Sequence, residues 1–159
     1  FVTVYIFSQN GINRHKGIAS MTEQLDSTKE LIITTLFSPI DELSGHTGSS
    51  KFKDEAISIE DYNGLIISPR MTAQNFRHRV SEPGYFTDWH MAGDATMIII
   101  RSGTLSLGLR SGEQRHFSAG DLFIAKDCLQ SNEEFNPNIH GHTAEVVGEQ
   151  SLMAVHIKL

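Results

Sequence analysis

Short segments with the composition of β-strands follow one another from Ile57 to the end of the chain. Turn-forming residues interrupt almost every gap between them, for example at Asn63-Gly64 and Gly120-Asp121. Short strands at this spacing, with no helical pattern between them, predict an all-β antiparallel sandwich or barrel. We expect strands at the segments 56–59, 65–68, 75–80, 85–91, 96–102, 104–110, 114–117, 122–126, 142–147 and 152–159.

The residues before this series have a different character. Val2–Phe7 is rich in β-forming residues, and a capping-box pattern predicts a short helix from Met21 towards Leu31. The apolar run 31–37 is compatible with a strand or with the end of that helix, and both interpretations stay open. The chain therefore divides into an N-terminal extension, residues 1–50, and a barrel, residues 51–159.

Composition narrows the functional class. The 159 residues suit a single domain, and a net charge of −6 with scattered Lys and Arg gives no basic stripe for nucleic acid. The longest aliphatic run, Met97–Ile100, is too short to span a membrane, and Phe1–Phe7 lacks the features of a signal peptide. The single cysteine, Cys128, allows no internal disulfide. We expect a cytoplasmic protein that binds neither nucleic acid nor membrane.

Two motifs indicate a family. The first motif has a glycine five residues before a histidine and is matched by Gly84, His90, Thr96 and Gly103. The second motif begins with Gly120-Asp121 and continues into an apolar strand. In this arrangement the stretch 84–126 resembles the cupin superfamily. The runs "PGYFTDWH" and "GHTAEVVG" are similar to small single-domain cupins of unassigned function. The resemblance implies an antiparallel double-stranded β-helix, the cupin jelly-roll barrel, behind the N-terminal extension.

The metal-ligand positions that the resemblance implies are mostly replaced. The second histidine of the first motif is Ala92, its glutamate is Thr96, and Ser131 stands where the second-motif histidine is expected. If "QSNEEFNPNI" is an insertion, His142 is that histidine displaced along the chain. His140 lies two residues earlier, so on an extended strand both rings would share a face.

Two classes of function follow. In the first, the protein is a cupin that binds a small, partly apolar molecule in its barrel, with Asp88, His90, Thr96 and His142 as ligand-binding residues. In the second, it is a metal-dependent enzyme of oxygenase or isomerase type. Its candidate ligands for Fe, Zn, Ni or Mn are His90, His140 and His142. A metal-free acid/base enzyme using Asp88 and His90 is a third alternative. The sequence leaves open whether the protein is an enzyme.

Other residues have two interpretations each. Arg77, Arg79 and Arg101 could hold a carboxylate substrate, but a solvated sheet face explains them equally. His156 is interpreted as a half-buried strand residue. We expect a homodimer in which the apolar segment Val2–Phe7 extends or covers a sheet edge, because unprotected edges promote association.

Overall fold

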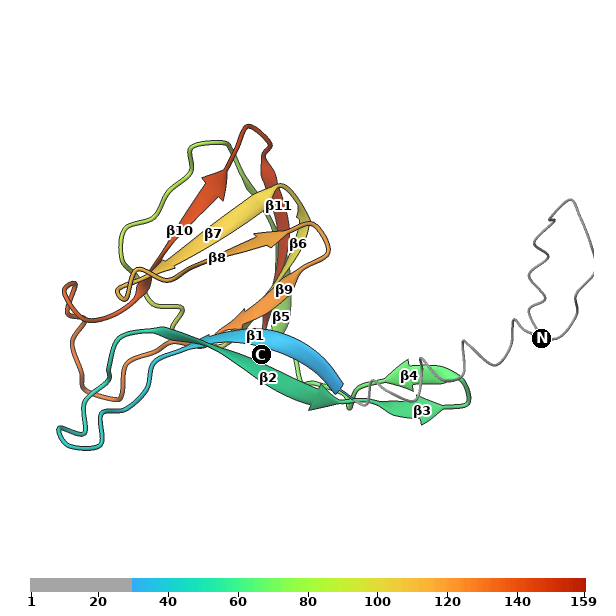
Figure 1. Cartoon of the computed structure of the whole chain (residues 1–159), viewed down its shortest axis with the longest axis horizontal. Coiled ribbons are helices and arrows are strands. Elements are labelled where there is room, and N and C mark those ends of the chain that lie inside the picture. Colours follow the sequence, from blue (N-terminus) through green and yellow to red (C-terminus); the bar gives the residue numbers. More distant parts are fainter. Residues whose placement is uncertain (1–29) are drawn as a thin grey trace, which may run out of the picture.

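Eleven strands make up the regular structure of residues 30–159, the part of the chain that the computed structural model describes (Figure 1). The strand expected at Val2–Phe7 and the start of the helix expected from Met21 lie outside these residues. The strands are β1 (Glu30–Phe37), β2 (Lys51–Ser58), β3 (Glu60–Tyr62), β4 (Leu65–Ile67), β5 (Asn75–Ser81), β6 (Thr96–Ser102), β7 (Thr104–Leu109), β8 (Gln114–Ser118), β9 (Leu122–Ala125), β10 (His142–Val147) and β11 (Leu152–Lys158).

The strands form two main sheets and one hairpin. The larger sheet has the order β2-β1-β9-β6-β11-β5, and the smaller has the order β10-β7-β8. The chain crosses from one sheet to the other four times, between β6 and β7, β8 and β9, β9 and β10, and β10 and β11, which is the connectivity of a jelly roll. The β3–β4 hairpin projects away from both sheets (Figure 1). The expected all-β jelly-roll fold is therefore confirmed.

One strand pair departs from the expected antiparallel arrangement. β1 pairs antiparallel with β2 but parallel with β9. We placed residues 30–37 in the N-terminal extension, whereas in the structure they lie within the larger sheet, between β2 and β9. Thr35 and Leu36 are fully buried there. An apolar run of this length has no periodicity that separates a strand from a helix, so only tertiary pairing decides between them.

The core lies between the two sheets and follows the alternation of each strand. Ile98 and Ile100 of β6 pack against Leu105 and Leu107 of β7, together with Val146 and other residues of the opposite sheet. Each buried side chain of this size stabilises the fold by about 1.5–3 kcal/mol. The alternation therefore aims every second residue of β6 and β7 into the space between the sheets.

The segment expected as a strand at 85–91 is irregular. It contacts β10 through two isolated bridges, Phe86 with Glu145 and His90 with His142. Backbone hydrogen bonds from Thr87 to Ala144 and between His90 and His142 hold it alongside that strand. The segment thus lines one edge of the smaller sheet.

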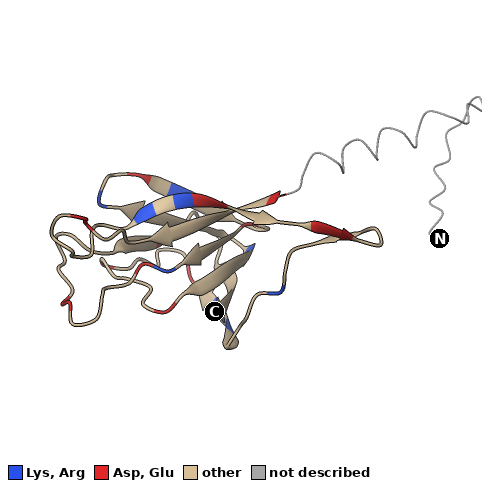
Figure 2. Ribbon diagram, turned by 90° about the horizontal axis from the view of Figure 1, so that it is seen from below, with Lys and Arg blue, Asp and Glu red and all other residues tan. Residues whose placement is uncertain are grey.

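Charged residues of both signs are interspersed over residues 30–159 (Figure 2). Within this range no helix is long and apolar enough to cross a membrane.

The turn at Gly103 gives a prediction about stability. Gly103 and Gly120 both have positive φ, 74° and 96°. Only at Gly103 would an added Cβ lie 2.8 Å from the Ser151 carbonyl oxygen and 2.9 Å from Leu152 Cα. We expect Gly120→Ala to cost about 1–2 kcal/mol, and Gly103→Ala about 2–4 kcal/mol. Urea denaturation measures both, and equal costs would contradict the close packing of this turn.

Candidate functional site

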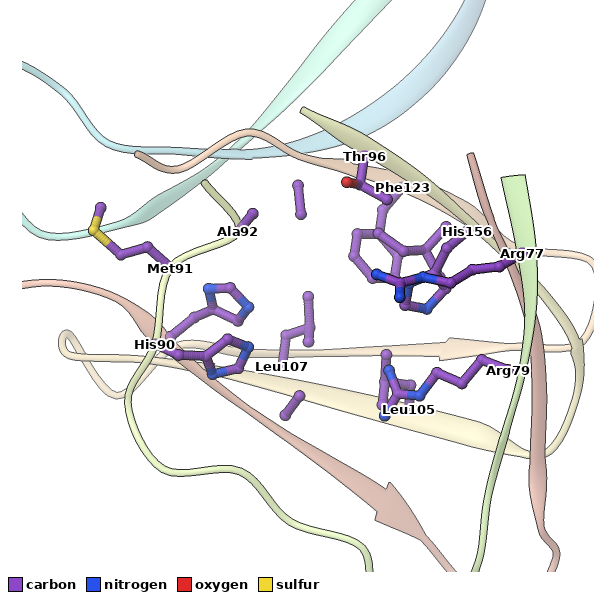
Figure 3. A pocket seen from close by; sticks show the side chains of 14 residues that line it. Arg77, Arg79, His90, Met91, Ala92, Thr96, Leu105, Leu107, Phe123 and His156 are labelled. Carbon is purple, nitrogen blue, oxygen red and sulfur yellow. The ribbon is translucent and has the colours of Figure 1, made fainter. Parts of the chain in front are cut away.

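A cavity of about 270 Å³ lies between the two sheets (Figure 3). Its apolar wall comes from inward-facing residues of β6, β7, β9 and β10. Its polar groups come from β5, from β11, from the first residues of β6 and β10, and from His90 in the segment that precedes β6. The lining residues are Arg77, Arg79, His90, Met91, Ala92, Thr96, Ile98, Leu105, Leu107, Phe123, Ala125, His142, Ala144 and His156.

His90 and His142 lie side by side at one end of this cavity. Their backbones exchange two hydrogen bonds, of 3.0 and 2.8 Å, and their ring centroids are 4.4 Å apart with a 49° angle between the planes. The His90 Nδ1–H donates to the Asp88 carbonyl oxygen at 2.9 Å, so its Nε2 is the free nitrogen. Burial, aided by the nearby His142 and Arg79, lowers the pKa of His90, although the bond to Asp88 opposes this.

Gly141 makes this close approach feasible. Its φ is +87°, and an added Cβ would lie 2.5 Å from the His90 carbonyl oxygen. A residue with a side chain would therefore push His90 away from β10. The left-handed backbone also interrupts the alternation of an extended strand. This is why His140 and His142 do not share a face as the sequence led us to expect.

The buried carboxylate of Asp127 holds the His142 ring. Its Oδ2 accepts hydrogen bonds from His142 Nδ1 and Ser50 Oγ, both at 2.8 Å, and its Oδ1 accepts the Ala92 N–H at 3.0 Å. The side chain is completely buried, and burial alone would raise the pKa of Asp127. The bonds from His142, Ser50 and Ala92 outweigh burial and lower that pKa. Asp127 therefore fixes the tautomer and orientation of His142, with Nε2 left free.

His140 belongs to a different part of the molecule. Its Nδ1 accepts the Asn136 N–H at 3.0 Å, and its Nε2–H donates to the Thr47 carbonyl oxygen at 3.0 Å. Both ring nitrogens are therefore occupied. Thr47 is held in turn by Glu133, which accepts its N–H at 3.0 Å and also its hydroxyl. The Thr47 hydroxyl bond, against a smaller opposing effect of burial, lowers the pKa of Glu133 to about 2.

The structure separates the predicted ligand-binding residues. His90, Thr96 and His142 line the cavity, with Thr96 on β6. The Asp88 side chain is exposed and is not part of the lining, and Asp88 reaches His90 only through its backbone carbonyl. The expected carboxylate–imidazole pair of Asp88 and His90 does not form. Its place is taken by Asp127 and His142.

The three histidines do not fit a resident metal. His90 and His142 offer two imidazoles, whereas the His140 ring is bonded to Thr47, and Asp127 already accepts three hydrogen bonds. Ala92, at the second ligand position of the first motif, supplies no donor. Within residues 30–159 no group of three or more His, Cys, Asp or Glu side chains could hold a metal ion. Three protein ligands are the usual minimum for a catalytic zinc site.

Two arginines and a histidine stand at the opposite side of the cavity from His90 (Figure 3). Arg77 and Arg79 project from β5, and His156 projects from the neighbouring strand β11. Sequence reasoning gave the arginines two interpretations and treated His156 as a strand residue. All three line the cavity. The same reasoning overlooked Asp127 and Ser50, which lie in loops without a motif spacing.

Similarity to known proteins is found at the level of solved structures. No family model matches the chain, and no curated protein matches it. Among solved structures, the cupin domain of Schizosaccharomyces pombe Cnp3 is similar to this chain. The TM-score is 0.37 and the identity 11%, over 86% of this chain and 88% of that one. The strand order of the chain itself carries the assignment of the fold.

The buried hydrogen bonds of Asp127 give a second stability prediction. Asp127→Asn should lower the free energy of unfolding by about 2–4 kcal/mol at pH 7, because an amide cannot accept all three donors. Folding lowers the pKa of Asp127, so the ionised group stabilises the protein above the unfolded pKa. The difference between wild type and variant should shrink as the pH falls below about 4.

Urea denaturation at several pH values measures this difference. Asp88→Asn is the matched control, because that side chain is exposed and outside the cavity, and it should leave stability unchanged. An Asp127→Asn variant as stable as the control would contradict the role of the buried carboxylate.

Proposed function

We propose that this chain is a cupin that binds a small, partly apolar molecule in the cavity between its sheets. The observation that carries the proposal is the composition of the lining. An apolar wall, including Leu107 and Phe123, separates a pair of imidazoles at one end from basic side chains at the other. Ligand sites have this character, with a mostly apolar surface and a few placed polar groups.

Small side chains keep this space open. Ala92, Ala125 and Ala144 line the cavity at positions where larger apolar residues would fill it. Small barrels are commonly filled by their own side chains, and unfilled apolar space forfeits packing energy. Retaining three alanines around one void supports a role for the void.

The free imidazole nitrogens give the ligand a polar anchor. His90 and His142 each use Nδ1 within the protein, to Asp88 and Asp127 respectively. Their Nε2 atoms make no hydrogen bond with residues 30–159 and can accept one from a ligand hydroxyl or a water. No arrangement of the described residues favours the metal-dependent alternative with His90, His140 and His142.

A cavity-filling variant tests this proposal. Small molecules screened by NMR should shift the methyl signals of Ile98, Leu105 and Leu107 when they bind. At a concentration one hundred times the Kd, binding adds about 2.7 kcal/mol of stability, which raises Tm by about 5–10 °C. Ala125→Leu should remove both effects, because its side chain occupies the ligand's space.

Ala56→Leu is the matched control, since this alanine lies exposed on β2. It should bind the same molecules as wild type. Ligands that bind Ala125→Leu and wild type equally, or that shift only signals around His140, would place binding outside the cavity and contradict the proposal.

A further inference from the structure

Strand β5 has its apolar side chains on the solvent face and its arginines on the cavity face, the reverse of what its hydrophobic pattern predicts. Phe76 and Val80 are 68% and 63% exposed, whereas Arg77 and Arg79, which alternate with the apolar residues, line the cavity. A strand with one solvated face ordinarily aims its apolar residues at the core. A slip of one residue would exchange the two faces, so the observed orientation must be held by its neighbour.

The pairing of β5 with β11 fixes this orientation of β5. Arg79 lies opposite Ala154, which is 1% exposed and belongs to the core. Arg77 lies opposite His156 on the same face of the sheet. Because directly opposed residues share a face, both arginines lie on the cavity side of the sheet, where Arg79 is half-buried and Arg77 remains exposed.

The inward charges lack counter-ions. Within residues 30–159, no Asp or Glu forms an ion pair with Arg77 or Arg79. Asp94 lines a recess next to Arg77, but it pairs with Lys158. The net charge of the chain is −6, so two inward arginines without acidic partners are a local excess of positive charge. A charge as buried as that of Arg79 is ordinarily paired.

The Arg79 guanidinium is held in place by neighbouring residues and still has one N–H donor without a partner among residues 30–159. Its Nε–H donates to Ser81 Oγ at 2.8 Å, and its guanidinium carbon lies 4.7 Å from the centroid of the Tyr85 ring. Its buried Nη2 has no hydrogen-bond partner among residues 30–159, and the same is true of His156 Nε2. Such unmade bonds cost free energy that a ligand can recover.

The charges also act on His156. Burial, together with the positive charges of Arg79 and Arg77, lowers the pKa of His156 to about 4. The imidazole is therefore neutral near pH 7, and its charge does not add to that of the arginines. A neutral ring can donate one hydrogen bond and accept another.

We propose that the ligand is a small organic carboxylate, with its carboxylate group held by Arg77 and Arg79 and its apolar body against Leu105, Leu107 and Phe123. Guanidinium groups bind carboxylates through two parallel hydrogen bonds. The cavity, at about 270 Å³, lies just below the about 300–1,000 Å³ that holds drug-sized molecules. This inference rests on the proposed function and names the chemical class of its ligand.

Matched acids and amides test the charge requirement. Butyrate, hexanoate and benzoate are each titrated beside the corresponding amide, which has nearly the same shape without the charge. Binding is followed by calorimetry and by the methyl signals of the cavity. We expect at least one acid to bind about tenfold or more tightly than its amide. This comparison uses the wild-type protein and depends on no variant.

Arginine variants then locate the contact. Arg77→Met and Arg79→Met each keep a long apolar side chain without the charge, and each should weaken binding of that acid by about tenfold or more. Arg101→Met removes a charge from an exposed position on β6 and should leave the affinity unchanged. Melting curves establish that the variants are folded.

The outcomes separate the two proposals. Acids and amides that bind the cavity equally, with no effect of Arg77→Met or Arg79→Met, would overturn the carboxylate inference and leave the proposed function standing. Failure of every acid and amide to affect the cavity methyl signals would overturn both. Inorganic phosphate that binds as tightly as the best acid would overturn the role of the apolar body.

Discussion

The buried carboxylate of Asp127 organises the end of the barrel on which the candidate site depends. It accepts hydrogen bonds from His142, Ser50 and the Ala92 N–H, which belong to three segments far apart in the sequence. Its backbone carbonyl also accepts the Gly93 N–H at 3.1 Å. A charge buried this deeply is tolerated only when its oxygens are satisfied, so the three segments are fixed relative to one another.

The geometry of the two histidines follows from this constraint. Asp127 orients His142, the close approach at Gly141 brings His90 alongside, and the two rings stand against each other at the cavity wall. The Nε2 atom of each ring then remains available to a ligand. The opposite side of the cavity is set by a different cause, the pairing of β5 with β11, which directs Arg77 and Arg79 inward. Because the polar groups at the two ends of this apolar cavity differ, a bound ligand would have one preferred orientation.

Much of the fold could be predicted from the sequence because it depends on local patterns. The strand segments at 96–102 and 142–147 match β6 and β10, since alternation and flanking turn residues define both. Asn63 and Gly64 form the turn between β3 and β4, with φ of 56° and 85°, as an Asn-Gly pair favours. Strand alternation from His90 predicts inward side chains at Asp88, Ala92, Thr96, Ile98 and Ile100. Ala92, Thr96 and Ile98 do line the cavity and Ile100 is buried, whereas the Asp88 side chain is exposed.

The rest of the site could not be predicted, because it depends on contacts between loops or on exceptions to local rules. No spacing links Asp127 to Ser50 or to His142, since each lies in or beside an irregular segment. His140 was expected beside His142 because the left-handed backbone of Gly141 is invisible in an alternation pattern. The hydrophobic pattern of β5 predicts that its apolar residues, and not its arginines, face the core. The orientation seen in the structure is set by the pairing with β11, which the sequence of β5 alone does not show.

The central claim is that the cavity between the sheets receives an organic carboxylate at its arginine side. A crystal structure of the protein grown with benzoate tests it most directly. The account predicts density for the ring against Leu105, Leu107 and Phe123, with carboxylate oxygens about 2.7–2.9 Å from guanidinium nitrogens of Arg77 or Arg79. Benzoate bound with its carboxylate away from both arginines, or bound only outside the cavity, would contradict it.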